Sequence, residues 1–562
     1  MKWIITIISF FSLELLFSLY RLEAQVYLHI DRSKYIAGED VWFSIYSVDP
    51  VLGKLSSKSS IAYIELINPW NRPLIQKRFQ LTDGKGEGNF LLPDSISSGT
   101  YIVRAYTRWM ENLLPDKCFI YEINVFNPFG ERYFWLNTDG KGPSSETQAQ
   151  LTGKKESKLF LETDSTFGRR EKVSLKIRIL NGSSALAGIS DLSISVAPAD
   201  VSFSSGWLND FSVPVPYPKQ IRFETNEHYL SGRIRYRESN TANSSHFLYM
   251  SVQGKVAEFD YAVIDTSGRF TFIMPLDNKS RNLILQPENA NNNMILEIEP
   301  SFSRRLPVSQ VIKESISDSL TSEFSELSFN YQAGKIYGTG LKKERVEKEE
   351  NNNKKKRFYG IPEMEIFLDD YISLPVMQEV FFELVPGVLL RSIKSGYDVK
   401  IINPLTGNYY AEPPLVMIDG VIINDLTVLG DLNPEKVEKI EVVKTPYLIG
   451  DLVLHGIVNV ITRSGDFSNI TLPDYTVVLP YRVIDNYDSF IAPEYSDKRK
   501  NQERMPDLRN TLYWNPSIKT NSRGEAETGF WTSDLPGTYT INIRGITSTG
   551  EKVSLNKTFV VR

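Results

Sequence analysis

Residues 413–425 read PPLVMIDGVIIND, and the fold expected for the C-terminal part of the chain follows from this stretch. Residues 415–418 form a short apolar run, Asp419-Gly420 is a dipeptide typical of two-residue hairpins, and residues 421–423 resume the apolar pattern. The pattern predicts a strand, a tight turn and a second strand. Because glycine adopts a positive φ without a steric penalty, we expect a structural role for Asp419-Gly420 rather than a binding role.

The sequence on both sides of this hairpin predicts an α+β domain. Residues 373–387 predict a helix that Ser373 caps and Gly387 ends, with one apolar face. Asn433-Pro434 begins a shorter helix, and KIEVVK (439–444) and HGIVNVITR (455–463) are strands. The side chains that we expect in the core are Ile418, Val421, Ile440, Val442, Val458 and Val460.

Residues 413–463 resemble the plug domain of TonB-dependent outer-membrane receptors, and a weaker likeness extends upstream to about Phe358. The motifs that carry the resemblance are Pro414-Leu415-Val416-x-Ile418-Asp419-Gly420, Asn433-Pro434-x-x-Val437-x-Lys439-Ile440-Glu441-Val442 and Gly456-Ile457-Val458-Asn459-Val460-Ile461-Thr462. The resemblance implies a plug-like domain over residues 358–470. The passage TPYLIGDLVLHG (445–456) departs from the Gly-rich pattern of the family.

In that family the plug is followed by a barrel of about 22 strands, each of about 9–11 residues. Residues 471–562 are too few for such a barrel and instead predict a soluble, macroglobulin-like β-module. We therefore do not expect receptor transport. The plug-like domain is expected to serve as an interaction domain.

The N-terminal sequence VYLHIDRSKYIAGEDVWFSIY (26–46) predicts two strands joined by a turn. Within it, Asp31-Arg32-x-x-Tyr35-x-x-Gly38-Glu39-x-Val41 resembles the opening of the second macroglobulin-type (MG2) domain of the α2-macroglobulin family. This resemblance implies a β-sandwich over residues 25–127. Turn positions are expected at Gly38, Gly99 and Gly537, and packing roles at Trp42, Trp109 and Trp531.

Similar sequences recur along the chain and predict several β-sandwich modules in series. DGKGEGNFLLPDSISSGTYIVRAY (83–106) is echoed by NSRGEAETGFWTSDLPGTYTINIRG (521–545) and, more faintly, by DTSGRFTFIMP (265–275). We expect one further sandwich over residues 150–225. Residues 226–305 resemble a carboxypeptidase-regulatory-like sandwich.

A change in composition between residues 306 and 357 predicts a boundary between domains. Residues 309–324 predict a short helix, and KKERVEKEENNNKKKR (342–357) is charged, polar and almost without apolar residues. Because acidic residues are interspersed among the basic ones, we interpret this stretch as a solvated linker and not as a nucleic-acid patch. The net charge of −5 agrees with this interpretation, because a negatively charged chain is not expected to bind nucleic acid.

The first 24 residues predict a signal peptide. Lys2 precedes an apolar run over residues 3–19, and Leu22-Glu23-Ala24 offers a cleavage site after Ala24. A retained membrane anchor is the alternative, since the run approaches the about 20 residues that a span needs. Glu14 within the run favours cleavage. The expected location is the periplasm or the outer membrane, with an indirect association with the membrane.

Residue patterns typical of catalysis are not found, so we expect no enzyme, no cofactor and no metal. The histidines His29, His228, His246 and His455 lack metal-ligand spacing, and His29 and His455 are expected to be packing or surface residues. Cys118, the single cysteine, is expected to be a buried thiol, because it has no neighbouring histidine. It also lacks the Cys-Gly-Glu-Gln context of the macroglobulin thioester, which makes covalent trapping of proteases implausible.

The sequence thus predicts a mainly β protein, with serial macroglobulin-like or Ig-like sandwiches and an α+β plug-like domain near the C-terminus. Its order of modules resembles a family of exported proteins in Bacteroidetes-type bacteria. The first hypothesis is a non-enzymatic envelope scaffold that docks on an outer-membrane protein or barrel. The alternatives are an accessory whose plug gates a separately encoded barrel in TonB-dependent transport, and a macroglobulin-type protease-binding protein or adhesin.

Overall fold

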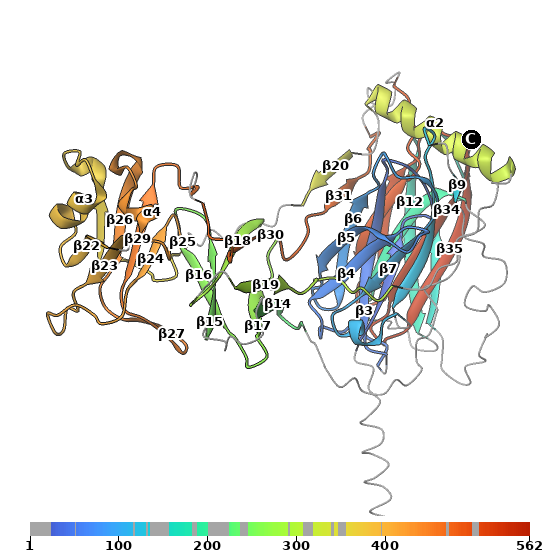
Figure 1. Ribbon diagram of the computed structural model, residues 1–562. Helices are drawn as coiled ribbons and strands as arrows, with labels where there is room; N and C mark the ends of the chain where they lie inside the picture. Colours follow the sequence, from blue (N-terminus) through green and yellow to red (C-terminus); the bar gives the residue numbers. More distant parts are fainter. Residues whose placement is uncertain are drawn as a thin grey trace, which may run out of the picture. The chain divides into compact units, whose positions relative to one another are not determined.

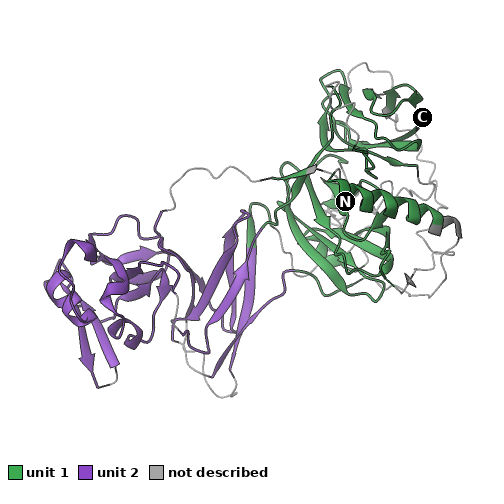
Figure 2. Cartoon of the chain, turned by 90° about the horizontal axis from the view of Figure 1, so that it is seen from above, with its two compact units in different colours: residues 1–228, 302–347, 484–562 green, residues 229–301, 348–483 purple. Residues whose placement is uncertain are grey.

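In the computed structural model of the protein, the chain folds into two compact units (Figure 2). Unit 1 contains residues 1–228, 302–347 and 484–562, and unit 2 contains residues 229–301 and 348–483. The structure describes residues 24–50, 52–115, 118–130, 133–134, 157–181, 188–199, 224–236, 246–289, 293–306, 318–338, 342–346, 356–394, 396–467, 471–496 and 505–562. The expected signal peptide lies outside these residues except for Ala24. Among the helices in these ranges, none is both long and apolar enough to cross a membrane.

The fold is mainly β, as the sequence predicts, and the first sandwich forms part of unit 1 (Figure 1). Its sheets have the strand orders β1-β3-β6 and β2-β8-β7-β4-β5, and β9 pairs with β7. Between the sheets, the ring of Phe43 packs edge-on against Phe79, with centroids 5.1 Å apart. The strands are β1 (Gln25–Ile30), β2 (Lys34–Ile36), β3 (Asp40–Val48), β4 (Ile61–Ile67), β5 (Pro73–Gln80), β6 (Lys85–Leu91), β7 (Ser98–Tyr106), β8 (Phe119–Phe126) and β9 (Tyr133–Phe134). All residues of β1, β4 and β7 are buried, so both faces of these strands are covered.

The second sandwich, also in unit 1, combines strands from two widely separated parts of the chain. Its sheets have the orders β10-β12-β33 and β11-β35-β34-β13-β32. The strands are β10 (Ser157–Glu162), β11 (Thr166–Phe167), β12 (Lys172–Asn181), β13 (Asp191–Pro198), β32 (Tyr513–Lys519), β33 (Glu525–Trp531), β34 (Gly537–Ile546) and β35 (Lys552–Val561). The expectation of separate sandwiches over 150–225 and 471–562 is therefore wrong. Along their edges, β12 pairs with β33, and β13 pairs with β32 and β34, so the C-terminal strands complete both sheets.

The third sandwich belongs to unit 2. Its sheets have the orders β17-β14-β19 and β16-β15-β18-β30. The strands are β14 (Glu227–Tyr236), β15 (Phe247–Val252), β16 (Glu258–Val263), β17 (Arg269–Pro275), β18 (Arg281–Pro287), β19 (Met294–Ile298) and β30 (Val477–Tyr481). β30 lies within the predicted terminal module (471–562) but pairs with β18, so residues 226–305 do not complete the sandwich alone and the expected module start at residue 471 needs correction.

The repeated sequences occupy the same position in all three sandwiches. In the pairs β6–β7, β33–β34 and β17–β18, the first strand is the edge of a three-stranded sheet and the second belongs to the larger sheet. The turns before the first strands place glycine at positive φ, namely Gly84, Gly524 and Gly268. Each first strand then buries a phenylalanine: Phe90, Phe530 and Phe270. The repeat is therefore the corner at which each chain segment passes from one sheet to the other.

The α+β domain follows the third sandwich in unit 2 (Figure 1). Its sheet has the order β21-β26-β29-β24-β25, in which β24 and β29 run parallel. The strands are β21 (Met364–Phe367), β24 (Leu415–Ile418), β25 (Val421–Ile422), β26 (Val437–Val443) and β29 (Ile457–Thr462), with the hairpins β22 (Val388–Ile393)–β23 (Gly396–Ile401) and β27 (Tyr447–Ile449)–β28 (Leu452–Leu454). Its helices are α3 (Met377–Leu384), α4 (Thr427–Gly430) and the 3-10 turns η3 (Leu368–Asp370) and η4 (Pro434–Lys436).

The hairpin predicted from residues 413–425 is confirmed. Ile418 lies opposite Val421, and the two turn residues have positive φ, +47° at Asp419 and +75° at Gly420. The six side chains predicted for the core are all buried in one hydrophobic cluster. Ser373 is not the helix cap, because α3 begins after Val376 without a side-chain hydrogen bond at its start.

Unit 2 has a second hydrophobic cluster, shared by the third sandwich and the α+β domain. It joins buried residues such as Met417 and Val443 to aromatic residues of the sandwich such as Tyr249 and Phe259. The sequence predicted independent domains at 226–305 and 358–470. The shared cluster shows instead that the two parts stabilise each other.

The predicted linker is partly ordered. Residues 342–345 form β20 (Lys342–Arg345), which pairs with β31 (Asp488–Ile491), and Lys343 Nζ lies 3.0 Å from Asp40 Oδ2 of the first sandwich. These charged residues are therefore held by ion pairs, which the linker interpretation missed, while residues 347–355 lie outside the described ranges. The helix expected at 309–324 is α2 (Asp318–Tyr337), which crosses one end of the unit 1 strands (Figure 1). Phe324 of this helix stacks on Phe126 at 5.3 Å, and the Tyr331 hydroxyl donates to the Gly38 carbonyl at 2.6 Å, while residues 309–317 of the expected helix lie outside the described ranges.

The expected turn and packing residues are confirmed in part. Gly38 has φ +87° in a turn, whereas Gly99 and Gly537 lie at the beginnings of β7 and β34 rather than in tight turns. Trp42 and Trp109 are buried, and Trp531 is half-buried.

Candidate functional site

The polar pattern from Asp31 to Glu39 folds into a compact hydrogen-bonded corner of the first sandwich. The Asp31 carboxylate accepts hydrogen bonds from the Tyr35 hydroxyl (2.6 Å) and the Trp42 backbone N–H (3.0 Å). Arg32 Nη2 lies 2.9 Å from Glu39 Oε2, which also accepts from the Ile36 N–H at 2.7 Å. Burial raises the pKa of Asp31, while the nearby Arg32 opposes the shift.

The same corner is the joint with the second sandwich. Thr511 Oγ1 donates to Asp31 Oδ2 (2.9 Å), and Asn510 Nδ2 donates to Glu39 Oε1 (2.9 Å). The Ser195 hydroxyl donates to the Asp31 carbonyl at 2.6 Å. We call this group of contacts the polar joint. The polar side chains between Asp31 and Glu39 thus hold two sandwiches together.

His29, which was expected to be a packing or surface residue, lies buried beside the polar joint. Its Nδ1 is 2.6 Å from Ser193 Oγ, and the Tyr46 hydroxyl donates to the same oxygen at 2.8 Å. Burial is the main cause that lowers the pKa of His29 well below its ordinary value, and Arg544 adds to the effect. A His–Ser pair can serve nucleophilic catalysis, but here both side chains are fully buried, so a substrate has no access to the hydroxyl.

The plug-like motifs also form buried structural contacts. The Asp419 carboxylate accepts from the Thr462 N–H (2.7 Å), the Thr462 hydroxyl (2.6 Å) and the Phe467 N–H (3.0 Å). Three charge-assisted bonds fix the turn to the strand β29 and hold Asp419 at its positive φ. The structural role expected for Asp419-Gly420 is therefore confirmed.

A second polar network lies on the other face of the same sheet. Glu441 is buried in β26, and its carboxylate accepts from the Tyr359 hydroxyl and lies 2.6 Å from Arg357 Nη2 and 2.7 Å from Lys439 Nζ. Asn459 Nδ2 in turn donates to the Tyr359 oxygen at 3.0 Å. The charge on Glu441 is thus balanced within the domain.

Exposed apolar side chains concentrate at the beginning of the α+β domain. Within residues 361–382 they are Ile361, Phe367, Tyr371, Ile372, Val376 and Phe382. Phe382 is 76% exposed on the outer side of α3, while Val380 and Phe381 of the same helix are buried. We call these six residues the apolar segment. The hairpin β27–β28 adds a cross-strand pair, Leu448 and Val453, that is also exposed.

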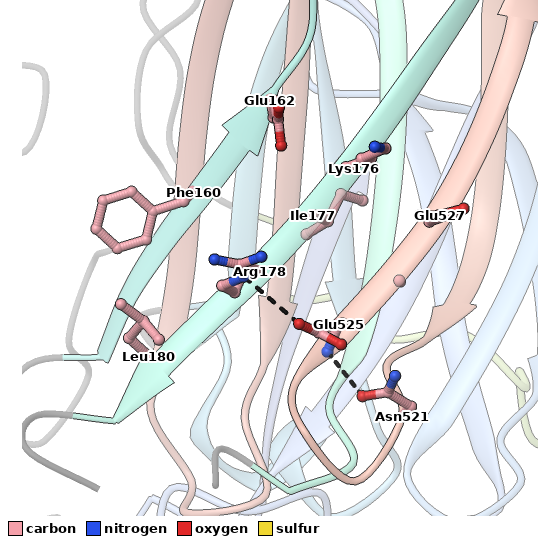
Figure 3. Close-up of a pocket in the computed structure, with 10 residues that line it drawn as sticks. Phe160, Glu162, Lys176, Ile177, Arg178, Leu180, Asn521, Glu525 and Glu527 are labelled. Atoms are coloured by element: carbon pink, nitrogen blue, oxygen red, sulfur yellow. Dashed lines mark hydrogen bonds and ion pairs between the residues drawn. The ribbon is translucent and has the colours of Figure 1, made fainter. Parts of the chain in front are cut away.

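A shallow pocket of about 570 Å³ lies over the three-stranded sheet of the second sandwich (Figure 3). Its charged residues alternate in sign, with Lys176 opposite both Glu162 and Glu527 on the neighbouring strands. Arg178 Nε also lies 3.5 Å from Glu525 Oε1, so opposite charges already balance one another. This mixed surface is typical of a solvated sheet face and gives no indication of a ligand.

The cysteine and the other three histidines considered in the sequence lie far apart from one another in the chain. Cys118 is buried, and its thiol donates to the Pro115 carbonyl at 3.5 Å. His228 is buried in unit 1, while His246 is exposed and His455 lies beside Tyr410 in unit 2. Within the described residues, groups of three or more metal-ligating side chains are not found.

Sequence reasoning missed the apolar segment and the function of the polar joint. Phe382 could have been noticed, because an outward helix position next to Glu383 usually carries a polar residue. The polar joint had no comparable signal, since Thr511 is 480 positions away from Asp31.

Comparisons with known proteins give a limited result. No protein-family model and no curated protein matches the chain. Among solved structures, trypsin-activated alpha-2-macroglobulin from Escherichia coli is 9% identical, with 96% of this chain and 41% of that chain covered and a TM-score of 0.25. Salmonella alpha-2-macroglobulin reacted with methylamine is 10% identical, with 96% and 40% covered and the same TM-score. This chain thus spans about two fifths of the length of those proteins, and so loose an overlap establishes neither a shared domain arrangement nor a shared function.

Proposed function

We propose that the protein is a non-enzymatic scaffold of the cell envelope, exported to the periplasm or outer membrane, that docks on an outer-membrane protein through its α+β domain. The observation that carries this proposal is the apolar segment. Single exposed apolar residues are common on soluble proteins, and the support for a contact surface is that six large ones recur within 361–382. Exposed acidic residues next to the segment in sequence, such as Asp370 and Glu383, would form its polar rim.

The internal contacts of the α+β domain support a role in presenting a surface to a partner rather than in catalysis. The carboxylates of Asp419 and Glu441 are engaged by neighbouring donors inside the domain. The motifs that resemble a receptor plug therefore build a rigid body, which leaves its surface to contact a partner. A rigid surface binds with a smaller loss of conformational entropy than a flexible one.

Replacing two exposed residues of the apolar segment is expected to decrease recovery of the partner strongly. In the double variant Ile372→Ser/Phe382→Ser, purification of the tagged full chain from solubilised envelopes should recover at least about tenfold less outer-membrane protein, because each lost anchor contributes about 1 kcal/mol or more. Both side chains are largely exposed, so the stability of the fold should change little.

The matched control is Phe329→Ser/Ile336→Ser, which removes two exposed apolar side chains from α2 in unit 1. It should recover the partner at the wild-type level. Equal recovery by both double variants would contradict docking through the α+β domain. Absence of any outer-membrane protein from the wild-type sample would contradict the scaffold function itself.

Export makes a separate prediction. If residues 1–24 are a signal peptide, the mature protein should begin close to Gln25, because the small Ala24 suits the position before the cleaved bond. Mass analysis of the N-terminal peptide from the cell envelope checks this. A mature protein that retains Met1 would show that the segment is kept as an anchor.

A further inference from the structure

The chain passes between the two units at four places, and three of these passages are described in unit 1. They are residues 224–228, 302–305 and 484–488, each of which adjoins unit 2 along the chain. All three contact strands β4, β5 or β7 of the first sandwich, and one residue, Arg78 of β5, contacts each of them. These three parts of unit 1, far apart in the sequence, thus meet at one buried residue.

Arg78 binds the three passages in different ways. Its backbone N–H donates to Asp485 Oδ2 (2.9 Å), and its carbonyl accepts from the Asp485 N–H (2.8 Å). Its guanidinium carbon lies 5.8 Å from the ring centroid of Phe302, and its Nη1 lies 3.0 Å from His228 Nε2. Arg78 is almost fully buried, so these contacts are protected from solvent.

Aromatic and charged neighbours complete the attachment. The Tyr63 hydroxyl donates to Glu224 Oε2 at 2.8 Å, and the Tyr63 ring meets Phe302 edge-on at 5.5 Å. The Ser303 N–H donates to the Tyr106 hydroxyl oxygen (3.0 Å), and Arg104 Nη2 donates to the Ser303 carbonyl (3.2 Å).

The hydrogen bonds of His228 require a neutral imidazole. Its Nδ1 lies 2.8 Å from Glu224 Oε1, a carboxylate that can only accept, so Nδ1 carries the proton. Its Nε2 faces the N–H of Arg78 and must therefore accept. A second proton on Nε2 would place two donors and two positive charges against each other.

The charged groups around His228 come from three elements. Glu224 precedes it on the same passage, Arg78 comes from β5, and Arg108 follows β7, where it pairs with Glu111 at 3.3 Å. Burial is the largest cause that lowers the pKa of His228, Glu224 opposes the shift, and Arg78 and Arg108 add to it. When residues 224–228 leave this site, water solvates His228, and its pKa returns to the ordinary value for histidine.

We propose that Arg78, Glu224 and His228 form a pH-dependent clamp that holds the three passages on unit 1 at neutral pH and loosens them in mild acid. The clamp is independent of the proposed function, since it concerns how the connections of unit 2 are held and not what unit 2 binds. Because folding favours neutral His228, the stabilisation is complete above the ordinary histidine pKa of about 6.5 and decreases as the pH falls below it.

Hydrogen exchange measured by mass spectrometry tests the clamp in the full chain. The wild type and His228→Gln are compared at pH 7.5 and pH 5.5 in peptides that cover the three passages. Glutamine keeps one donor and one acceptor but does not titrate. Comparison at equal pH cancels the intrinsic pH dependence of exchange, and His29 is present in both proteins, so its own titration cancels as well.

We divide the exchange rate of the wild type by that of His228→Gln in each passage. This ratio should be up to about tenfold higher at pH 5.5 than at pH 7.5. The reason is that pH 5.5 lies one pH unit below the ordinary histidine pKa, where protonation favours the released state about tenfold. His246→Gln, which changes an exposed histidine, should exchange like the wild type at both values. Equal ratios at the two pH values would overturn the proposal. If His228→Gln fails to fold, Arg78→Gln, which removes one repelling charge, should show a smaller pH response than the wild type, and an unchanged response would overturn the proposal equally.

Discussion

Val442→Asp is expected to unfold unit 2 and to leave unit 1 folded. Val442 is fully buried in β26, where it lies opposite Met364 of β21 and Val458 of β29. An aspartate there would have no partner for its charge, and burying it costs several kcal/mol. A domain with a typical free energy of unfolding of about 5–15 kcal/mol would lose most or all of its stability.

The loss should spread through unit 2, because the α+β domain and the third sandwich share a hydrophobic cluster. Unit 1 has its own sandwich core and should keep its melting transition. Scanning calorimetry of the full chain should therefore show one transition fewer than in the wild type.

Val453→Asp is the matched control, since Val453 is 45% exposed in the hairpin β28 of the same domain. This change should alter the free energy of unfolding by about 0.5 kcal/mol or less. If Val442→Asp melted like Val453→Asp, the assignment of β26 as a buried strand of the core would have to be abandoned.

Asp31→Ala is expected to destabilise unit 1 by about 3–5 kcal/mol. The change removes the carboxylate that accepts from Tyr35, Trp42 and Thr511, and each buried donor left without a partner costs about 1–3 kcal/mol. Because Thr511 belongs to the second sandwich, the joint between the two sandwiches should weaken together with the corner itself. Denaturant titration, followed by a probe in unit 1, measures the effect.

Thr511→Val distinguishes the contribution of the polar joint to stability from that of the hydrogen-bonded corner. Valine has a shape similar to that of threonine but lacks the hydroxyl group. The change therefore removes one hydrogen bond to Asp31 and leaves the bonds of Asp31 to Tyr35 and Trp42 in place. We expect a loss of about 1 kcal/mol. If Asp31→Ala cost no more than Thr511→Val, the polar joint could not be a main source of the stability of unit 1.

Much of the local structure could be predicted from the sequence. The hairpin at Asp419-Gly420 and the buried positions in β26 and β29 follow from residues only a few positions apart, because side chains alternate between the two faces of a strand. The repeated corners were predictable for the same reason, since a turn glycine and a buried phenylalanine lie within one short segment.

The partners of the strands were not predictable in the same way. The alternation in β12 shows which face is buried, but every β-strand offers the same backbone donors and acceptors along its edges. Nothing in residues 172–181 therefore indicates that β33, near the end of the chain, completes the sheet. This one cause explains why residues 150–225, 226–305 and 471–562 were wrongly predicted to form self-contained modules.

The sequence by itself thus determined the strands, the turns, the buried faces and the mainly β fold class, because these depend on neighbouring residues. Only the tertiary structure decided which strands share a sheet and which polar groups meet. Arg78 and His228 are 150 positions apart, and Asp31 and Thr511 are 480 apart. Such pairs form because whole sheets pack against each other. The free energy of that packing comes from many contacts between residues far apart in the sequence, so it cannot be inferred from any short stretch.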